Sequence, residues 1–281
     1  MKTVFLLLFH LCLPLLAGAG ELVIEPAVIA AGEVALIRWS DQGAMAGTVE
    51  FNGRVFTLDK TDHGGRALLG TDLDTAPGIY PIRVRLAGSD LLVKGHLRVV
   101  LAQRPEERLT LPDAMVSPKD PAILKRIERE QVLLKSIFAQ QSAGAVPGSF
   151  RLPVSDPIGS LFGMRRILNG QPRSPHAGID FRSPRGAPVK ASAAGVVAYV
   201  GDLYYTGLTA VVDHGGGLFT LYCHLGQLDC VAGQVLQPDE ILGRVGSTGR
   251  STGAHLHWGV KLRGDRIDPL ALAALLNGKK S

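Results

Sequence analysis

Apolar and polar residues alternate with a period of two in short runs across the first third of the chain. The run Tyr80–Leu86 places apolar residues on one face of a strand and arginines on the other, as in a half-buried β-strand. Asn52 and Gly53 separate two further runs and form a dipeptide typical of a tight hairpin. Many short strands without a helical period are typical of a sandwich. We therefore predict an immunoglobulin-like β-sandwich domain over residues 20–105.

The period changes to that of an α-helix between residues 117 and 142. Asp120 followed by Pro121 is a favourable N-cap and first-turn pair. The apolar residues at helical spacing are Ile123, Ile127, Leu134, Ile137 and Phe138. Charged residues fill the other side. We predict a linker over residues 106–149 that contains one amphipathic helix, whose apolar face docks on one of the two neighbouring domains.

Glycine and short apolar runs dominate from Phe150 to the end of the chain. Helical spacing is absent there until residues 269–276. This pattern is typical of a compact antiparallel sheet whose loops carry the chemistry. We predict such a domain over residues 150–281, and a mainly β fold for the whole chain.

The first 19 residues read as a signal peptide. Lys2 precedes an apolar run, which ends before the small residues Ala17, Gly18 and Ala19. The run is too short to span a membrane and contains a proline. We expect cleavage after Ala19, no membrane span in the mature chain, and an exported protein, either in the periplasm or cell envelope or secreted. An uncleaved N-terminal anchor is the alternative.

The charge balance is mildly basic. The chain has 30 lysines and arginines against 25 aspartates and glutamates, a formal charge of +5. Removal of the signal peptide takes away only Lys2 among charged residues, which leaves +4. Such an excess suits an anionic envelope polymer. No basic block with interleaved aromatic residues is present, so the sequence does not indicate nucleic-acid binding.

Two cysteines remain after cleavage, Cys223 and Cys230. Disulfides persist in exported proteins, so we predict a bridge between them across a short loop. Two buried free thiols are the alternative.

Residues that can bind a metal gather in the C-terminal part. His176 and Asp180 are an even number of residues apart, and so are His255 and His257, so each pair shares one face of an extended segment. By the same parity His224 shares a face with Tyr222, and Cys223 points the other way. Two histidines, one carboxylate and an open fourth position are the pattern of catalytic zinc, and further histidines can move protons or stabilise an oxyanion. Spacing alone does not say which of His255 and His257 binds the metal.

A series of short motifs, in a fixed order along residues 162–269, points to one family of proteins. It comprises Phe162-Gly163-Met164-Arg165, His176-Ala177-Gly178-Ile179-Asp180, Gly186-Ala187-Pro188-Val189, Ala194-Gly195-Val196-Val197, Leu221-Tyr222-Cys223-His224-Leu225, Gly246-Ser247-Thr248-Gly249, Ser251-Thr252-Gly253-Ala254-His255-Leu256-His257-Trp258 and Asp268-Pro269. The segment that they span, residues 162–269, resembles the lysostaphin-like, LytM-type zinc metalloendopeptidases, which cut peptide stems or bridges of bacterial peptidoglycan.

The resemblance implies a role for each candidate residue. It assigns His176, Asp180 and His257 as ligands of one zinc ion per chain, and His224 and His255 as the two histidines that assist water activation and stabilise the tetrahedral intermediate. The substrate groove is expected to be lined by Tyr222, Arg250, Ser251 and Thr252.

The resulting functional hypothesis is an exported zinc endopeptidase that hydrolyses peptide cross-links of peptidoglycan, with stem peptides as its partners. Resemblance to envelope enzymes with added N-terminal domains suggests the bond between D-alanine and a diamino acid. A secreted glycyl-glycine endopeptidase that acts on other bacteria, and a non-catalytic activator of cell-wall amidases, are the alternatives. A hydrolase that could lyse its own cell also motivates autoinhibition, in which residues before Phe150 cover the zinc cleft; a passive targeting domain is the alternative.

Overall fold

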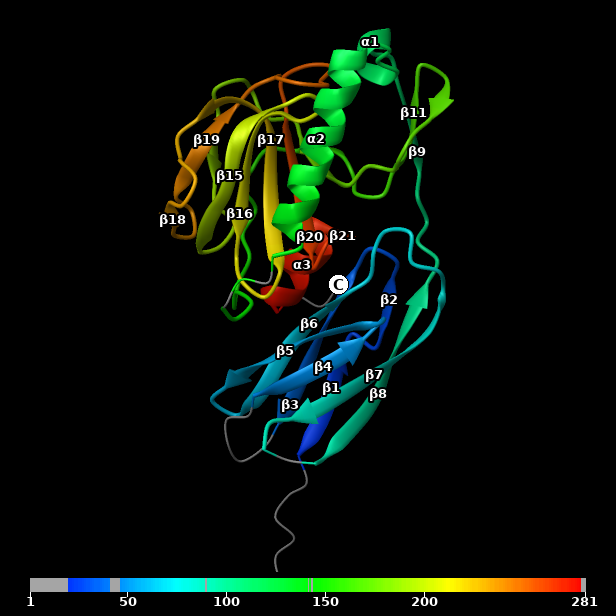
Figure 1. Ribbon diagram of the computed structural model, residues 1–281, viewed down its shortest axis with the longest axis vertical. Helices are drawn as coiled ribbons and strands as arrows, with labels where there is room; N and C mark the ends of the chain where they lie inside the picture. Colours follow the sequence, from blue (N-terminus) through cyan, green and yellow to red (C-terminus); the bar gives the residue numbers. More distant parts are fainter. Residues whose placement is uncertain (1–19, 41–45, 89, 141, 143, 279–281) are drawn as a thin grey trace, which may run out of the picture.

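The computed structural model describes residues 20–40, 46–88, 90–140, 142 and 144–278. The fold is mainly β, as predicted: two β regions are joined by a linker that carries the longest described helix (Figure 1). The predicted signal peptide lies outside the described residues. Within the described part of the chain, no helix is long and apolar enough to cross a membrane.

The N-terminal region is an eight-stranded sheet folded into two layers. In sheet order its strands are β1 (Glu21–Glu25), β3 (Val34–Ser40), β6 (Gly64–Gly70), β5 (Arg54–Thr61), β4 (Gly47–Phe51), β7 (Gly78–Leu86), β8 (Leu92–Val100) and β2 (Val28–Ala30). Strand β5 pairs with β4 along its first part and with β6 along its last part, so it links the two layers. Ile82 and Val84 of β7 are buried between the layers, whereas Arg83 and Arg85 are exposed, as the alternation predicts.

The linker contains β9 (Glu106–Leu109), α1 (Asp113–Val116) and α2 (Pro121–Phe138). Helix α2 is the predicted amphipathic helix, and the Asp120 carboxylate caps it by accepting a hydrogen bond from the backbone N–H of Ala122 at 2.7 Å. Ile137 and Phe138 pack against Val211 and Phe219. The apolar face of the helix therefore docks on the C-terminal sheet, which the sequence left open (Figure 1).

The C-terminal region is a ten-stranded antiparallel sheet with one terminal helix. Its main path is β10 (Ile158–Ser160), β13 (Gly178–Phe181), β20 (Leu256–Leu262), β17 (Leu218–Leu228), β16 (Gly207–Asp213), β15 (Gly195–Leu203) and β18 (Val235–Leu236); β14 (Pro188–Lys190), β19 (Ile241–Val245) and β21 (Asp265–Ile267) pair beside it. Helix α3 (Pro269–Leu276) covers one end.

A smaller three-stranded sheet links the linker to this region. Strand β9 runs parallel to β11 (Arg165–Leu168), which also pairs with β12 (Gln171–Pro172). The sequence did not predict a strand at β9. Its pairing with β11 places linker residues beside the loop that leads to His176.

The two β regions meet at the far end of β20. The Arg266 guanidinium binds Asp72 (Nε to Oδ2, 3.0 Å), and the Arg54 guanidinium binds Asp265 at 2.6 and 2.9 Å. Apolar residues of β3 and β6 share a core with Ile267. Asp265 and Ile267 pair with Leu262 and Val260, which follow His257 by five and three residues, about 16 and 10 Å along β20. These contacts of the sandwich therefore lie away from the predicted site.

Candidate metal centre

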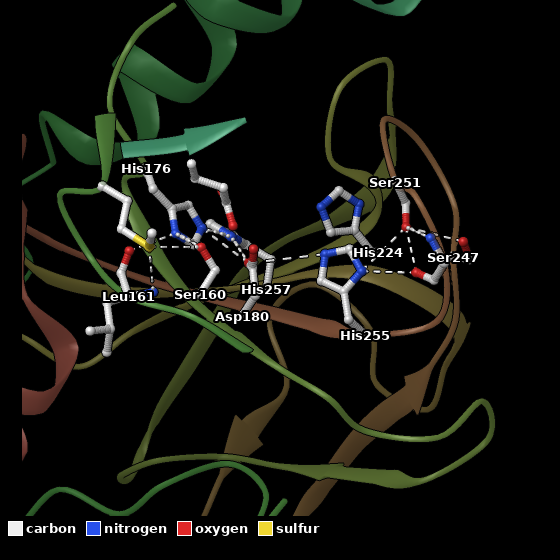
Figure 2. A network of polar contacts seen from close by, with 12 residues as sticks. Ser160, Leu161, His176, Asp180, His224, Ser247, Ser251, His255 and His257 are labelled. Atoms are coloured by element: carbon white, nitrogen blue, oxygen red, sulfur yellow. Dashed lines mark hydrogen bonds and ion pairs between the residues drawn. The ribbon is translucent and has the colours of Figure 1, made fainter. Parts of the chain in front are cut away.

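His176, Asp180 and His257 converge on one point (Figure 2). The Asp180 Oδ1 atom lies 3.0 Å from His176 Nε2 and 2.7 Å from His257 Nδ1, and the two nitrogens are 2.9 Å apart. Asp180 of β13 lies directly opposite His257 of β20 in the antiparallel register. Sheet pairing therefore joins residues that are far apart in the sequence.

Gly178 is required for this close approach. A Cβ atom there would lie 2.5 Å from the Trp258 carbonyl oxygen and 2.8 Å from the His257 ring. Any side chain at this position would push β13 away from β20, so the glycine allows the Asp180 carboxylate to reach His257.

The donor atoms are oriented for a cation. His176 Nδ1 donates to the Leu161 carbonyl oxygen at 2.9 Å, so Nε2 of the neutral ring turns its lone pair toward Asp180 and His257. Burial alone would raise the pKa of Asp180, but the close contacts with His176 and His257 outweigh it and hold that pKa far below its usual value. Burial lowers the pKa of His257 to about 4, although Asp180 opposes the shift. An ionised carboxylate and neutral imidazoles are the forms that bind metals.

The geometry of these atoms also fits a metal ion. Tetrahedral zinc with bonds of 2.0–2.1 Å separates its ligand atoms by roughly 3.3 Å. The separations of 2.7–3.0 Å approach this value, so small movements would complete such a site. The cluster can therefore hold a metal ion.

Arg166 and Glu107 support the cluster from outside. Arg166 Nη2 lies 2.9 Å from Asp180 Oδ2, and its Nε lies 3.1 Å from Glu107 Oε2. Arg166 of β11 is the register partner of Glu107 in β9. Sequence reasoning missed both residues because no local pattern indicated that the linker pairs with β11.

His224 and His255 flank the cluster, with ring centres 4.7 Å apart (Figure 2). His224 Nδ1 donates to the Thr248 carbonyl oxygen at 2.8 Å, and His255 Nδ1 donates to that of Gly253 at 2.9 Å. Each Nε2 is thus left unprotonated in the neutral ring. That of His255 lies 4.0 Å from Asp180 Oδ1. Burial, with the charges of the neighbouring histidines, lowers the pKa of His224 to about 3, so it is a neutral base at neutral pH.

The prediction that His224 shares a strand face with Tyr222 was wrong. His224 has a left-handed backbone with φ of 59°, which breaks the alternation of β17. Tyr222 is completely buried on the core side, where its hydroxyl contacts Ser192 and Thr220. Cys223 pairs in register with His257, and the left-handed residue lets His224 also reach the metal side. Tyr222 is therefore not a groove residue.

The predicted disulfide is also contradicted, because Cys223 and Cys230 are buried free thiols. The segment expected to be a loop is the continuation of β17 to Leu228. Strand β17 continues to Leu228, two residues before Cys230, so the chain does not turn back after Cys223 as a short bridged loop would require. Burial raises the pKa of Cys223 to about 12 and that of Cys230 to about 11.

The remaining groove candidates do lie at the cluster. Arg250, Ser251 and Thr252 line one small cavity together with site residues and a wall from the linker and β11; the other lining residues are Leu109, Leu111, Arg166, Leu168, Asp180, His224 and His255. Ser251 Oγ donates to the Gly253 carbonyl oxygen at 2.6 Å and lies 3.3 Å from His255 Nδ1 (Figure 2). It thus helps to hold the loop that positions His255.

The antiparallel sheet thus carries a three-residue cluster that can hold a metal ion. Residues 174–269 match the profile described as Peptidase family M23. A solved putative peptidase M23 from Pseudomonas aeruginosa is 31% identical, with a TM-score of 0.71 over 88% of this chain and 95% of that chain. The chain belongs to peptidase family M23, which confirms the resemblance seen in the sequence.

Curated relatives match the C-terminal region. The DD-carboxypeptidase/endopeptidase Mpg of Neisseria meningitidis serogroup B is 42% identical over 98 residues, which cover 35% of this chain and 23% of that protein. The peptidoglycan DD-endopeptidase ShyA of Vibrio cholerae is 37% identical over 114 residues, 40% of this chain and 26% of that protein. The chain thus spans about a quarter of the length of these relatives.

Proposed function

We propose that this chain is an exported zinc endopeptidase that hydrolyses peptide cross-links of peptidoglycan in the bacterial cell envelope. The main support is the geometry of the site. Ligand atoms of His176, Asp180 and His257 lie within 3.0 Å of one another, and His224 and His255 lie beside them with unprotonated Nε2 atoms. The names of the relatives Mpg and ShyA support the substrate class and the envelope location. Export rests on the signal-peptide pattern of residues 1–19.

The proposed mechanism follows from the donor set. His176, Asp180 and His257 would hold one zinc ion, which supplies Lewis-acid polarisation of a carbonyl and a lowered water pKa. Arg166 keeps the Asp180 carboxylate in place through Oδ2, so Oδ1 remains the ligand atom. His224 and His255 accept the proton of the attacking water, and in protonated form they donate to the oxyanion or to the leaving amine.

The test is mass spectrometry of fragments released from purified sacculi with diaminopimelate cross-links. Zinc-loaded protein of residues 20–281 should convert cross-linked stem dimers into monomers, and His255→Ala should not. Zinc content near one ion per chain is expected. Zinc binding without release from these sacculi would contradict the proposed substrate; release from glycine-bridged walls would then indicate a glycyl-glycine endopeptidase, and stimulation of an amidase would indicate an activator.

We also propose that the linker, rather than the sandwich, restricts access to the cleft. Two observations support this proposal. Leu109 and Leu111 line the cavity that contains His224 and His255, and the sandwich contacts the sheet near Asp265, away from His257. Autoinhibition would then be a steric effect of residues 106–117.

Truncation of the two leucines tests this proposal. Leu109→Ala with Leu111→Ala should raise kcat/KM on sacculi several-fold, because it lowers the wall of the cavity. The matched control is Leu124→Ala, which removes a half-exposed leucine from α2. A folded double variant with unchanged or reduced kcat/KM would favour a passive or groove-building linker.

A further inference from the structure

Arg250 differs from the other partly buried arginines of the protein. Arg166, Arg263 and Arg266 each donate hydrogen bonds to carboxylates or carbonyl oxygens. Among the described residues, no side chain or carbonyl accepts a hydrogen bond from the Arg250 guanidinium. The guanidinium carbon lies over the Tyr205 ring, 4.4 Å from the ring centroid. A partly buried charge without a hydrogen-bond acceptor is costly unless a ligand supplies one.

The backbone around Arg250 is held firmly. Its N–H donates to the Tyr205 carbonyl oxygen at 2.8 Å. Thr248 Oγ1 accepts from the N–H of Leu208 and donates to the carbonyl of Leu225, both at 2.8 Å. Gly249, with φ of 69°, crosses the 205–207 loop so closely that a Cβ would lie 2.3 Å from a backbone nitrogen. The guanidinium therefore projects from a preorganised platform.

The local charge favours an anion. Burial lowers the pKa of Arg250, and the nearby charges of Arg166 and Arg173 lower it further. Arg166 is engaged with Asp180 and Glu107. The Arg173 Nε atom is buried and lacks a hydrogen-bond partner among the described residues. A negative group beside Arg250 would relieve this repulsion.

The position of Arg250 narrows the identity of that group. Arg250 lines the same small cavity as Asp180, His224 and His255, so a group bound there belongs to a residue next to the scissile bond. A planar guanidinium matches a carboxylate well. A peptide carries a carboxylate at this place when the carbon that bears the leaving amine also bears a free carboxyl group. A C-terminal residue has this arrangement, and so does a diamino acid that is cross-linked through an amine beside its own carboxyl group.

We propose that Arg250 binds the free carboxylate on the carbon next to the leaving amine. The proposal rests on the proposed peptidase function and specifies its substrate. One site would then accept both cross-links of this kind and peptides whose C-terminal residue supplies the leaving amine. It would disfavour bridges in which the residue on the amine side lacks the carboxylate. Arg250 would determine which substrates are preferred. The metal-binding residues, together with His224 and His255, would carry out the hydrolysis.

The test compares two synthetic cross-linked stem peptides that differ in one group. In the first the carboxyl group beside the leaving amine is free, and in the second it is an amide. Zinc-loaded wild-type protein of residues 20–281 should show a kcat/KM roughly 10- to 100-fold higher for the acid, the usual effect of a charge-assisted hydrogen bond. Arg250→Gln should lower kcat/KM for the acid peptide to that for the amide peptide and leave kcat/KM for the amide peptide unchanged. Arg250→Lys should restore part of the preference for the acid.

The matched control is Arg98→Gln, which removes an exposed arginine from β8 of the sandwich and should preserve the preference. Equal cleavage of both peptides by the wild type, or an equal loss on both in Arg250→Gln, would overturn the role of Arg250 and leave the peptidase function intact. Cleavage of neither peptide would overturn the proposed function. Calorimetric binding of both peptides then decides the carboxylate site: tighter binding of the acid that Arg250→Gln abolishes supports it, and equal binding overturns it.

Discussion

His214 and His224 lie on opposite faces of the same sheet and show what distinguishes a structural histidine from one available for chemistry. Their side chains are almost equally buried, with 6% and 7% exposure. His214 uses both ring nitrogens, with the Ala194 carbonyl and the Thr220 hydroxyl each at 2.8 Å. Within the described part of the chain, the ring of His224 forms a hydrogen bond only through Nδ1, to the Thr248 carbonyl. The two histidines are almost equally buried. They differ because Nε2 of His224 has no hydrogen-bond partner among the described residues and lies beside the metal-binding residues.

The surroundings explain this difference. On the core face, His214 lies beside Phe150, which stacks on Trp258, and the hydroxyls of Thr220 and Tyr222 continue its hydrogen-bond chain. On the metal face, His224 and His255 are held by carbonyls of loop residues 248–253 and turn toward Asp180 and His257 (Figure 2). The core face stabilises the sheet, and the metal face supplies reactive groups.

The largest effect is expected from Asp180→Asn, which keeps the shape of the metal face but removes its negative charge. The amide is a weaker metal ligand and loses the ion pair with Arg166. Metal content should fall well below one ion per chain, and activity should fall by at least ~10⁴-fold, since metal polarisation contributes several kcal/mol. Elemental analysis and cleavage of sacculi measure the two. Asp202→Asn, at an exposed carboxylate, is the control; an Asp180→Asn protein that retains metal and activity would contradict the assignment.

A smaller loss is expected when the flanking histidines are changed one at a time. His224→Ala and His255→Ala should each lower kcat by roughly 10²- to 10³-fold, the usual contribution of one proton-transfer or oxyanion group. Metal content should stay unchanged, because neither residue belongs to the three-atom cluster. Loss of metal in either variant would instead show that this histidine helps to bind the metal, and would contradict its assignment to proton transfer or oxyanion stabilisation.

Much of this arrangement could be predicted because it depends on local patterns. Alternation identified the buried residues of β7, and Asp120 with Pro121 marked the start of α2. The motifs around His176, His224 and His255 named the residues that the structure brings together. Even spacing was sufficient for His255 and His257, because His255, which pairs with Gly246, directly precedes β20 and both rings lie beside His224.

The errors occurred where the backbone departs from regular geometry or where distant segments pair. Strand parity placed His224 with Tyr222, but the left-handed φ of His224 reverses its direction. The extension of β17 to Leu228 separates two cysteines that a loop would have let meet. The pair formed by Arg166 and Glu107 depends on the parallel pairing of β9 with β11, for which neither segment carries a local signal.

The core-face histidine should affect stability rather than turnover. Burial lowers the pKa of His214 to about 4 from 6.5, so unfolding below pH 6.5 takes up a proton that the folded state does not bind until about pH 4. The contribution of His214 to the free energy of unfolding is therefore full above pH 6.5. It falls by about 3 kcal/mol as the pH is lowered to about 4. Urea unfolding of metal-free wild type and His214→Gln should show the variant less stable at pH 7, with the gap narrowing toward pH 4. A gap that does not change with pH would mean that folding does not shift the pKa of His214.

The smallest effect is expected at Cys223, which lies between the core-face Tyr222 and the metal-face His224. Because Cys223 and Cys230 are buried thiols with raised pKa values, about 12 and 11, neither should react with a thiol reagent at neutral pH in the folded protein. Both should react after denaturation of residues 20–281, and a reductant should leave Tm and activity unchanged. A disulfide would give the opposite pattern, with no titratable thiol after denaturation and a lower Tm in reductant. It would also require β17 to bend sharply after Cys223, which would move His224 away from His257 and remove the contrast between the two faces.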